Sequence, residues 1–277
     1  MGPFEKVVFA GGGSRCFWQM GFWGVVAEPL SLKPKAVSAV SAGSAMACAL
    51  FSGEADAVLA HFKTITAKNP KNYYLQNLLS DERIYPHYGM YRETLLNFVD
   101  ASTLKRLHDG PDIRVVFARP PRWLGGRAGL VLGMAGYSLE KKLFEPLHAQ
   151  AGRLLGFEAE TVPVSACKTP EELADLIIAS SCTPPFTPLL SRDGRPVLDG
   201  GVVDSVPVFA VDDLPGKTLV LLSRPYERPL PQTGERLYVQ PSKKTPVSKW
   251  DYTRPDLLQQ TYDLGRRDGE AFLQTQA

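Results

Sequence analysis

The stretch AVSAVSAGSAMACAL, residues 36–50, decides the fold. A short apolar run turns through Ser41 and Gly43 into an alanine-rich segment, which predicts a strand, a sharp turn and a helix. This is the layout of a nucleophile elbow, Gly-x-Ser-x-Gly, in which small residues around the serine let the strand and helix backbones approach each other. Ala39 replaces the first glycine, and Gly43 supplies the second. Ser41 is therefore the candidate nucleophile; the alternative is an ordinary tight turn that contains a serine.

A glycine-rich loop precedes the elbow. The apolar residues 7–10 predict a buried strand, GGGSRC follows at residues 11–16, and helical spacing extends from residue 17 to residue 30. Such a loop directs several backbone N–H groups to one point at a helix N-terminus, where the helix dipole favours negative charge. It could hold a phosphate or a developing oxyanion, or be a structural turn. Dinucleotide binding is disfavoured, because a Rossmann fingerprint needs glycine at position 16 and a P-loop needs Gly-Lys-Ser/Thr.

The elbow serine needs a base, and Asp199 is the candidate. The chain has four histidines: His61, His87, His108 and His148. None follows a strand near the end of the chain, where an α/β-hydrolase keeps its catalytic histidine, so the usual triad is not expected. Asp199 ends a short predicted strand and precedes Gly200 and Gly201, which permit close approach. Asp-Gly is also a common turn sequence, so this motif alone is weak.

Together the three segments resemble the patatin-like phospholipase family. The family pattern is a glycine-rich oxyanion loop after the first strand, Gly-x-Ser-x-Gly after the second, and Asp-Gly-Gly or Asp-Gly-Ala near the end of the catalytic core. Residues 11–16, 39–43 and 199–201 are similar to these motifs and occur in the same order. The sequence ASSCTPPFTPLL at residues 179–190 also resembles a family segment rich in Ser, Pro and Phe. The similarity extends over residues 7–208.

The resemblance implies an α/β fold, a three-layer α/β/α sandwich with a mostly parallel central sheet. It also implies a serine acyl hydrolase that cleaves carboxylic esters of lipids, as a phospholipase A or lysophospholipase does, with Ser41 as nucleophile and Asp199 as base. No metal or cofactor is implied. The expected oxyanion loop is Gly11, Gly12, Gly13, Ser14 and Arg15, where Arg15 would hold the loop or meet a lipid phosphate. The residues expected to support the elbow and the dyad are Ala39, Gly43, Gly200 and Gly201.

Three departures from the family pattern bear on these roles. Cys16 replaces the last glycine of the loop, Ala39 replaces the first glycine of the elbow, and Asp204-Ser205 stands where the family often has asparagine before Pro207. None of them removes a catalytic group. Two alternatives stay open: an acyltransferase that uses the same dyad, and a non-catalytic lipid-binding protein.

Length and composition predict one globular domain over residues 1–277. The chain is 44% hydrophobic and 22% charged, which is ordinary for a soluble fold. We expect the core motifs within residues 5–210, a lid or cap excursion over 68–137, proline-rich loops over 226–247 and a closing helix over 254–275. With 31 basic and 29 acidic residues and no sustained basic stripe, no nucleic-acid partner is expected.

The cysteines and the apolar runs indicate the compartment. Four cysteines without CxxC spacing favour a reducing environment, so we expect a cytoplasmic protein that contacts membranes peripherally. Residues 1–10 contain no apolar run of signal-peptide length. The longest uncharged run, residues 36–53, contains the elbow, so it is not expected to span a membrane.

A basic segment with a tryptophan, residues 114–137, lies outside the family pattern. Its charged and aromatic residues are Arg114, Arg119, Arg122, Trp123 and Arg127. A basic, tryptophan-bearing, glycine-rich segment is typical of an interfacial or lid element that contacts anionic lipid. The alternative is a core helix with an exposed basic flank.

Overall fold

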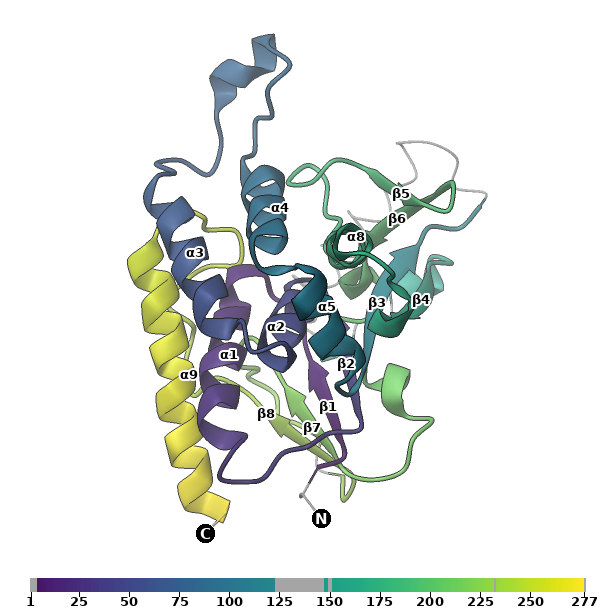
Figure 1. Ribbon diagram of the computed structural model, residues 1–277, viewed down its shortest axis with the longest axis vertical. Helices are drawn as coiled ribbons and strands as arrows, with labels where there is room; N and C mark the ends of the chain where they lie inside the picture. Colours follow the sequence, from purple (N-terminus) through teal and green to yellow (C-terminus); the bar gives the residue numbers. More distant parts are fainter. Residues whose placement is uncertain (1–3, 123–146, 149–150, 232, 277) are drawn as a thin grey trace.

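The computed structural model describes residues 4–122, 147–148, 151–231 and 233–276. Its centre is a mixed sheet in the order β5-β6-β3-β2-β1-β7-β8, with β4 also paired to β3 (Figure 1). The strands are β1 Lys6–Phe9, β2 Ala36–Val40, β3 Asp112–Arg119, β4 Glu158–Pro163, β5 Leu190–Arg192, β6 Arg195–Asp199, β7 Thr218–Leu221 and β8 Arg236–Val239.

Helices flank this sheet, and short 3-10 turns follow several strands. The α-helices are α1 Phe17–Val26, α2 Ala42–Phe51, α3 Ala55–Ala67, α4 His87–Phe98, α5 Ala101–His108, α7 Ala151–Leu154, α8 Pro170–Ser180 and α9 Pro255–Gln276. The 3-10 turns are η1 Gly13–Cys16, η2 Leu75–Leu79, η3 Val164–Ala166, η4 Gly200–Val202 and η5 Val208–Val211.

The strand directions match the predicted α/β class. The five strands β1, β2, β3, β7 and β8 pair in parallel, with Val7 beside Val37 and beside Leu219. Most of their buried residues are apolar on both faces, as expected for strands covered on both sides; buried Lys6, Ser38, Arg119 and Thr218 are the polar exceptions. Strands β4 and β6 run antiparallel to β3. Strand β8 lies within the stretch 226–247 that the sequence predicts as loops, so that prediction is wrong at the sheet edge.

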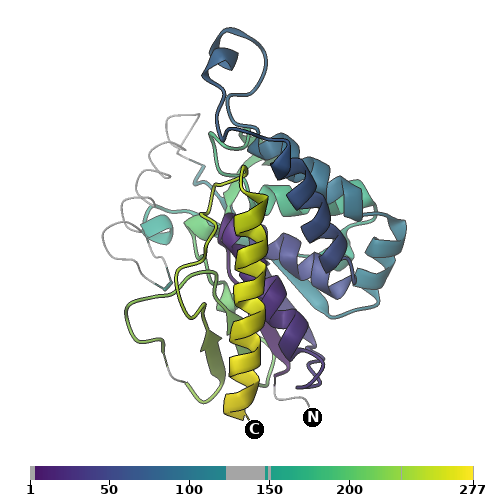
Figure 2. The same ribbon diagram turned by 90° about the vertical axis from the view of Figure 1, so that its left-hand side faces the viewer.

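Each face of the sheet has its own apolar core. On one face, side chains such as Phe9, Val37 and Val115 pack against α1, α2 and α8, and α9 covers α1 (Figure 2). On the other face, Val8 and Val220 pack against Val208 and its neighbours in the segment that follows Asp199. In the part of this segment before η5, Pro207 accepts a hydrogen bond from Ser38 Oγ on β2 at 2.7 Å. The segment is thereby fixed beneath the strand that ends at the elbow.

The predicted excursion over 68–137 is only partly a projection. Residues 68–86, which we call the finger, extend away from the body between α3 and α4 at the top of Figure 1. Residues 87–119 instead form α4, α5 and the central strand β3, because their apolar side chains complete the main core. Residues 123–137 lie outside the described residues.

Two arginines of the 114–137 segment are not available to a membrane. Arg119 is buried, and its guanidinium contacts Glu160 on the neighbouring strand β4 at 2.6 Å. Arg114 bonds Asp213 at 2.6 Å and Asp112 at 2.7 Å. The predicted cluster of membrane-facing arginines is therefore wrong for these two; Arg122 is exposed, and Trp123 and Arg127 are not among the described residues. Within the described chain, no helix combines the length and apolar character that a membrane span requires.

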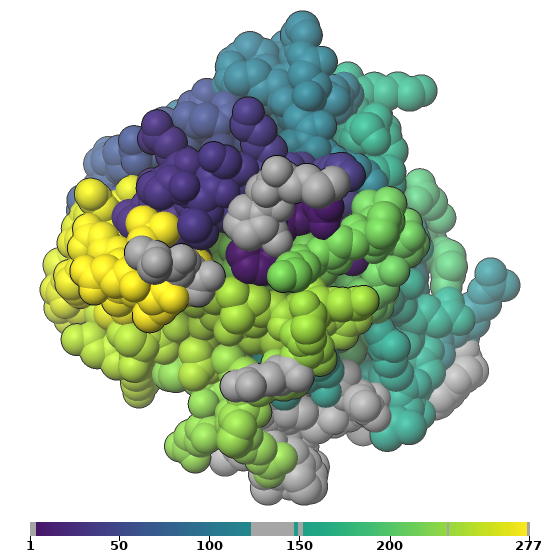
Figure 3. All heavy atoms as spheres, turned by 90° about the horizontal axis from the view of Figure 1, so that it is seen from below, coloured from purple at the N-terminus to yellow at the C-terminus, as the bar shows by residue number. Residues whose placement is uncertain are grey.

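Helices α1 and α9 cross at two glycines. A Cβ on Gly265 would lie 2.1 Å from the carbonyl oxygen of Trp18, and one on Gly21 would lie 2.0 Å from that of Tyr262. The indole of Trp18 donates to Asp268 on α9 at 2.7 Å. Seen from below, α9 (yellow) lies beside the α1 region (purple) (Figure 3). The long C-terminal helix is thus held by direct backbone approach.

This crossing predicts opposite effects for two glycine-to-alanine changes. Gly265→Ala places a methyl group against the backbone of α1. It is expected to lower the free energy of unfolding by about 1–3 kcal/mol, because the two helices must separate. Gly89→Ala in α4, where a Cβ meets open space, is the control and is expected to raise it by about 0.5–1 kcal/mol. Urea denaturation measures both. Equal effects of the two changes would contradict the close crossing.

Candidate active site

Ser41 lies at the turn between β2 and α2. Its backbone has φ 56°, a region that residues other than glycine rarely adopt. A Cβ at position 43 would lie 2.6 Å from the carbonyl oxygen of Phe9, so only glycine lets α2 start this close to β1. The backbone N–H of Ser41 donates to Ser180 Oγ at 2.8 Å, and Ser180 Oγ donates to the carbonyl of Val116 at 2.6 Å. The strained turn is therefore tied to α8 and β3.

The carboxylate of Asp199 meets the hydroxyl of Ser41. Ser41 Oγ donates to Asp199 Oδ2 at 2.6 Å, and both residues are buried. This distance is typical of a hydroxyl bonded to a charged carboxylate. Among the described residues, Asp199 is the only partner of Ser41 Oγ, and no histidine bonds either side chain.

Two contacts orient the carboxylate, and a third fixes the backbone of Asp199. The backbone N–H of Gly201 donates to Asp199 Oδ1 at 2.7 Å, and Thr183 Oγ1 donates to Oδ2 at 3.2 Å. The backbone N–H of Asp199 itself donates to the carbonyl of Cys182 at 2.7 Å. A Cβ on Gly200 would lie 2.4 Å from the carbonyl of Val116, so glycine is needed for this turn to approach β3. The Asp-Gly-Gly sequence thus both turns the chain and holds the acid.

The glycine loop lies directly beside Ser41. A Cβ on Gly11 would stand 3.2 Å from Ser41 Cβ, and Gly13 has φ 59°. In the described residues no group accepts from the backbone N–H of Gly12 or Gly13. The N–H of Gly11 donates to the carbonyl of Ser205 at 2.9 Å and that of Ser14 to the carbonyl of Lys249 at 3.1 Å, so both groups already have an acceptor in this structure. Arg15 Nε donates to Gly12 and so holds the loop.

The sequence that builds this site also matches a protein-family model. The model of the patatin-like phospholipases matches residues 7–212, about three quarters of the chain. The chain belongs to the patatin-like phospholipase family. The match covers the glycine loop, the elbow and the Asp199 turn, and it supports a lipid acyl hydrolase in general.

Two further comparisons add little to this assignment. Among solved structures, VipD from Legionella pneumophila aligns with a TM-score of 0.45 and 10% sequence identity, over 97% of this chain and 67% of VipD. Comparison with functionally curated proteins gave no match. The family assignment therefore rests on the family model.

In this patatin-like chain a narrow pocket opens over the serine. The Ser41 pocket is lined by Gly13, Ser41, Ala42, His87, Tyr91, Ser181, Phe186, Thr187, Trp250 and Tyr252. Its volume of about 20 Å³ holds roughly one water molecule. Part of its wall is aromatic, since Phe186 stacks on Trp250 with ring centres 4.3 Å apart and His87 lies 4.9 Å from Phe186. An acyl ester can enter only if these side chains move.

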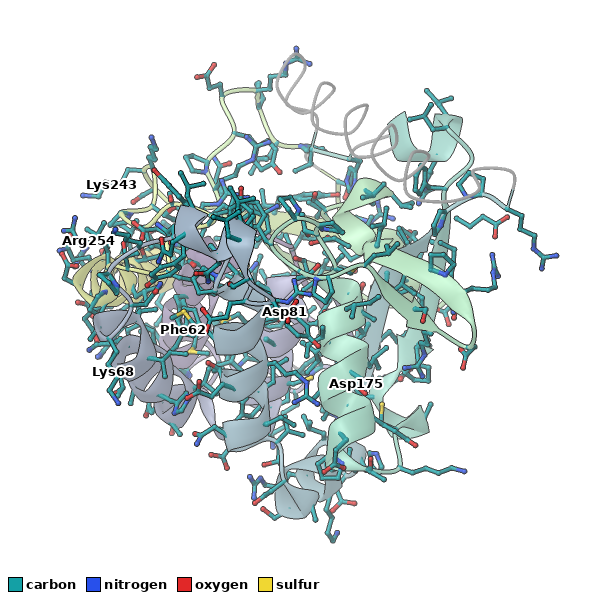
Figure 4. The ribbon with its side chains drawn as sticks, turned by 90° about the horizontal axis from the view of Figure 1, so that it is seen from above. Phe62, Lys68, Asp81, Asp175, Lys243 and Arg254 are labelled. Atoms are coloured by element: carbon teal, nitrogen blue, oxygen red, sulfur yellow. The ribbon has the colours of Figure 1, made fainter. Side chains whose placement is uncertain are left out.

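A second, almost wholly apolar pocket adjoins the first. The two share Gly13, Ala42, Tyr91 and Tyr252. The apolar pocket is further lined by Ser14, Phe17, Ala45, Met46, Val58, Phe62, Thr94, Leu95 and Phe98. Figure 4 looks onto this end of the molecule and labels Phe62 of α3. The pocket lies between the elbow helix and α3 and α4, so it leads away from Ser41 into the main core.

Several residues of this site escaped prediction from the sequence. Ser180, Thr183, Tyr91 and Trp250 reach the site from separate parts of the chain, and only the first two fall in the stretch that resembles the family. His87 is 2% exposed and its Nε2 donates to the carbonyl of Trp250 at 2.9 Å. Its Nδ1 is buried with no partner among the described residues. Burial lowers the pKa of His87 below its usual 6.5.

The departures from the family motif are accommodated. Cys16 is buried, and its Sγ lies 3.5 Å from the carbonyl of Ala10; burial raises the pKa of this thiol to about 12, so it stays protonated. Ala39 is fully buried in the main core. Asp204 accepts from the backbone N–H of Val206 at 2.8 Å and lies 2.9 Å from His148 Nδ1, so it orders the turn that carries Ser205 to the glycine loop.

The buried, neutral His87 predicts a pH dependence of stability. Below about pH 6.5 an unfolded histidine takes up a proton that folded His87 resists, so the free energy of unfolding falls as the pH falls, by up to about 1.4 kcal/mol per pH unit. His87→Gln is expected to remove this part of the slope, whereas the exposed His108→Gln retains it. Urea denaturation across the pH range measures both. A slope that is unchanged in His87→Gln would show that His87 titrates normally.

Proposed function

We propose that the chain is a lipid acyl hydrolase in which Ser41 attacks a carboxylic ester and Asp199 serves as the base. The observation that carries this proposal is the 2.6 Å hydrogen bond from Ser41 Oγ to Asp199 Oδ2 inside a match to the patatin-like phospholipase model. A nucleophile bonded to an oriented base is the arrangement that covalent catalysis requires. The substrate class is an ester of a lipid, as in phospholipase A or lysophospholipase reactions.

The reaction proceeds in two halves. In the first, Ser41 Oγ bonds to the ester carbonyl carbon while its proton passes to Asp199. We assign the stabilisation of the oxyanion that forms to the N–H groups of Gly12 and Gly13, which have no acceptor in the described chain. As the intermediate collapses, the alcohol leaves with the proton from Asp199, and the acyl group stays on Ser41. Water then attacks the acyl group and gives a proton to Asp199. As the bond between the acyl carbon and Ser41 Oγ breaks, this proton returns to Ser41 Oγ, and the fatty acid is released.

The apolar pocket would receive the acyl group, although its volume is also about 20 Å³, so a long chain enters only if the lining side chains move. It begins at Ala42, next to the nucleophile, and its lining is almost wholly apolar from there on. An alkyl chain gains about 0.8 kcal/mol for each methylene that leaves water, so such a lining favours an acyl chain over a polar group. The Ser41 pocket is also mostly apolar, but it includes the hydroxyls of Tyr91 and Ser181, hydrogen-bonded at 3.2 Å, which would face the head-group side of the ester.

Loss of the nucleophile is expected to abolish turnover. Ser41→Ala should lower kcat on a fatty-acyl ester by at least about 10⁴-fold, because no other group can form the acyl intermediate. It should also lose covalent labelling by a fluorophosphonate. Ser38→Ala is the control from the same strand; its hydroxyl bonds Pro207 on the opposite face of the sheet, so labelling should persist. Labelling that survives in Ser41→Ala would overturn the assignment of the nucleophile.

The identity of the base predicts the pH profile. In model peptides aspartate titrates near ~3.9 and histidine near ~6.5, so a carboxylate base leaves kcat/KM without an acid limb between about pH 8 and 5.5. Asp199→Asn keeps the shape but not the charge and is expected to lower kcat by at least about 10³-fold. An acid limb within this pH range that disappears in His87→Gln would identify a histidine base instead.

A further inference from the structure

The finger presents apolar side chains to solvent. Nine large hydrophobic side chains are exposed in the described chain. Four of them belong to one seven-residue stretch of the finger, residues 73–79: Tyr73, Leu75, Leu78 and Leu79. Leu79 is 97% exposed, Leu78 63% and Leu75 61%. No residue of η2 is buried. These side chains stand on a projection that leaves the body, so the body cannot cover them (Figures 1 and 2).

The finger has internal structure of its own. The backbone N–H of Tyr74 donates to the carbonyl of Ile84 at 2.8 Å, which joins its two arms. Asn77 Nδ2 donates to the carbonyl of Arg83 at 2.9 Å across the tip, and η2 turns the chain between them. The leucines therefore lie on a tip that has its own hydrogen bonds. Leu75 and Leu78 are separated by one turn of the 3-10 helix η2, so they lie on the same side of it.

The base of the finger is bonded to the wall of the Ser41 pocket. Asn69 Nδ2 donates to the carbonyl of Tyr252 at 2.9 Å, and the N–H of Tyr252 donates to Asn72 Oδ1 at 2.8 Å. At the other arm, Tyr85 packs on Phe186 with ring centres 4.9 Å apart. Phe186 and Tyr252 both line the Ser41 pocket. The finger thus rises from the rim of the candidate active site, at the end of the sheet where β1 and β2 terminate (Figure 1).

We propose that the finger is an interfacial anchor, which inserts Leu75, Leu78 and Leu79 into a lipid surface and places the Ser41 pocket against it. The choice of a lipid surface rests on the proposed function, because a lipid hydrolase must take its substrate from an aggregate. Charge supports apolar insertion: residues 68–86 carry three basic and two acidic side chains, too even a balance for electrostatic docking.

Binding is tested without turnover, in full-length protein that carries Ser41→Ala. Phosphatidylcholine vesicles are sedimented at low and high salt, and bound protein is measured. The triple change of Leu75, Leu78 and Leu79 to serine is expected to lower partitioning by at least about a hundredfold, because each leucine that enters an apolar phase contributes about tenfold. High salt should leave binding of the parent unchanged. Leu154→Ser, an 85% exposed leucine in α7, is the matched control and should bind as the parent does.

Insertion itself is tested by a probe at the tip. All four native cysteines are buried, and burial raises the pKa of Cys16 and Cys48 to about 12 and of Cys167 and Cys182 to about 11. Ser80→Cys can therefore be labelled selectively with a polarity-sensitive dye. Its emission should shift to the blue on phosphatidylcholine vesicles and be quenched by spin-labelled lipid.

Three outcomes would overturn the proposal. The triple variant could bind vesicles as well as the parent does, or binding of the parent could disappear at high salt. The third is a concentration-dependent dimer in solution that the triple variant loses, which would assign the finger to a second copy of the chain. Because every arm measures binding in Ser41→Ala, none of these results bears on whether Ser41 is the nucleophile. Unchanged thermal unfolding of the triple variant establishes that it is folded.

Discussion

The close approach of α2 to β1 is the constraint on which the candidate site depends. Where a Cβ at position 43 would stand 2.6 Å from the carbonyl of Phe9, the helix must start almost on top of the strand. Ser41 then adopts its positive φ, and Ser180 holds the backbone there from α8. The same approach places Gly11 against Ser41 Cβ. Nucleophile and glycine loop are therefore set by one contact between backbones, which any side chain at residue 43 would prevent.

The Asp199 turn completes the site through a second close approach. A Cβ on Gly200 would lie 2.4 Å from the carbonyl oxygen of Val116 on β3. Ser180 Oγ donates a hydrogen bond to this same carbonyl oxygen. Serine, acid and the strand between them are thus fixed to one point of the sheet. The cost of a buried carboxylate is offset by donors from Ser41, Thr183 and Gly201.

The fold class and the contact between Ser41 and Asp199 could be predicted from the sequence, because both depend on short motifs that contain characteristic glycines. Contacts between residues that are far apart in the sequence could not be predicted. Arg119 belongs to a basic run in the sequence, yet its partner Glu160 lies on another strand. His87 has no local motif, and the pocket that it lines is built from five separate segments. The alternation that would mark β8 is too short to distinguish from a loop.

The central claim is an acyl intermediate on Ser41, and the most direct measurement is rapid acid quench of the enzyme with a fatty-acyl ester, followed by peptide mass spectrometry. The account predicts an acyl mass on the peptide that contains Ser41, formed before fatty acid is released and absent in Ser41→Ala. An acyl mass on any other residue would contradict it, as would hydrolysis that proceeds in Ser41→Ala at the parent rate.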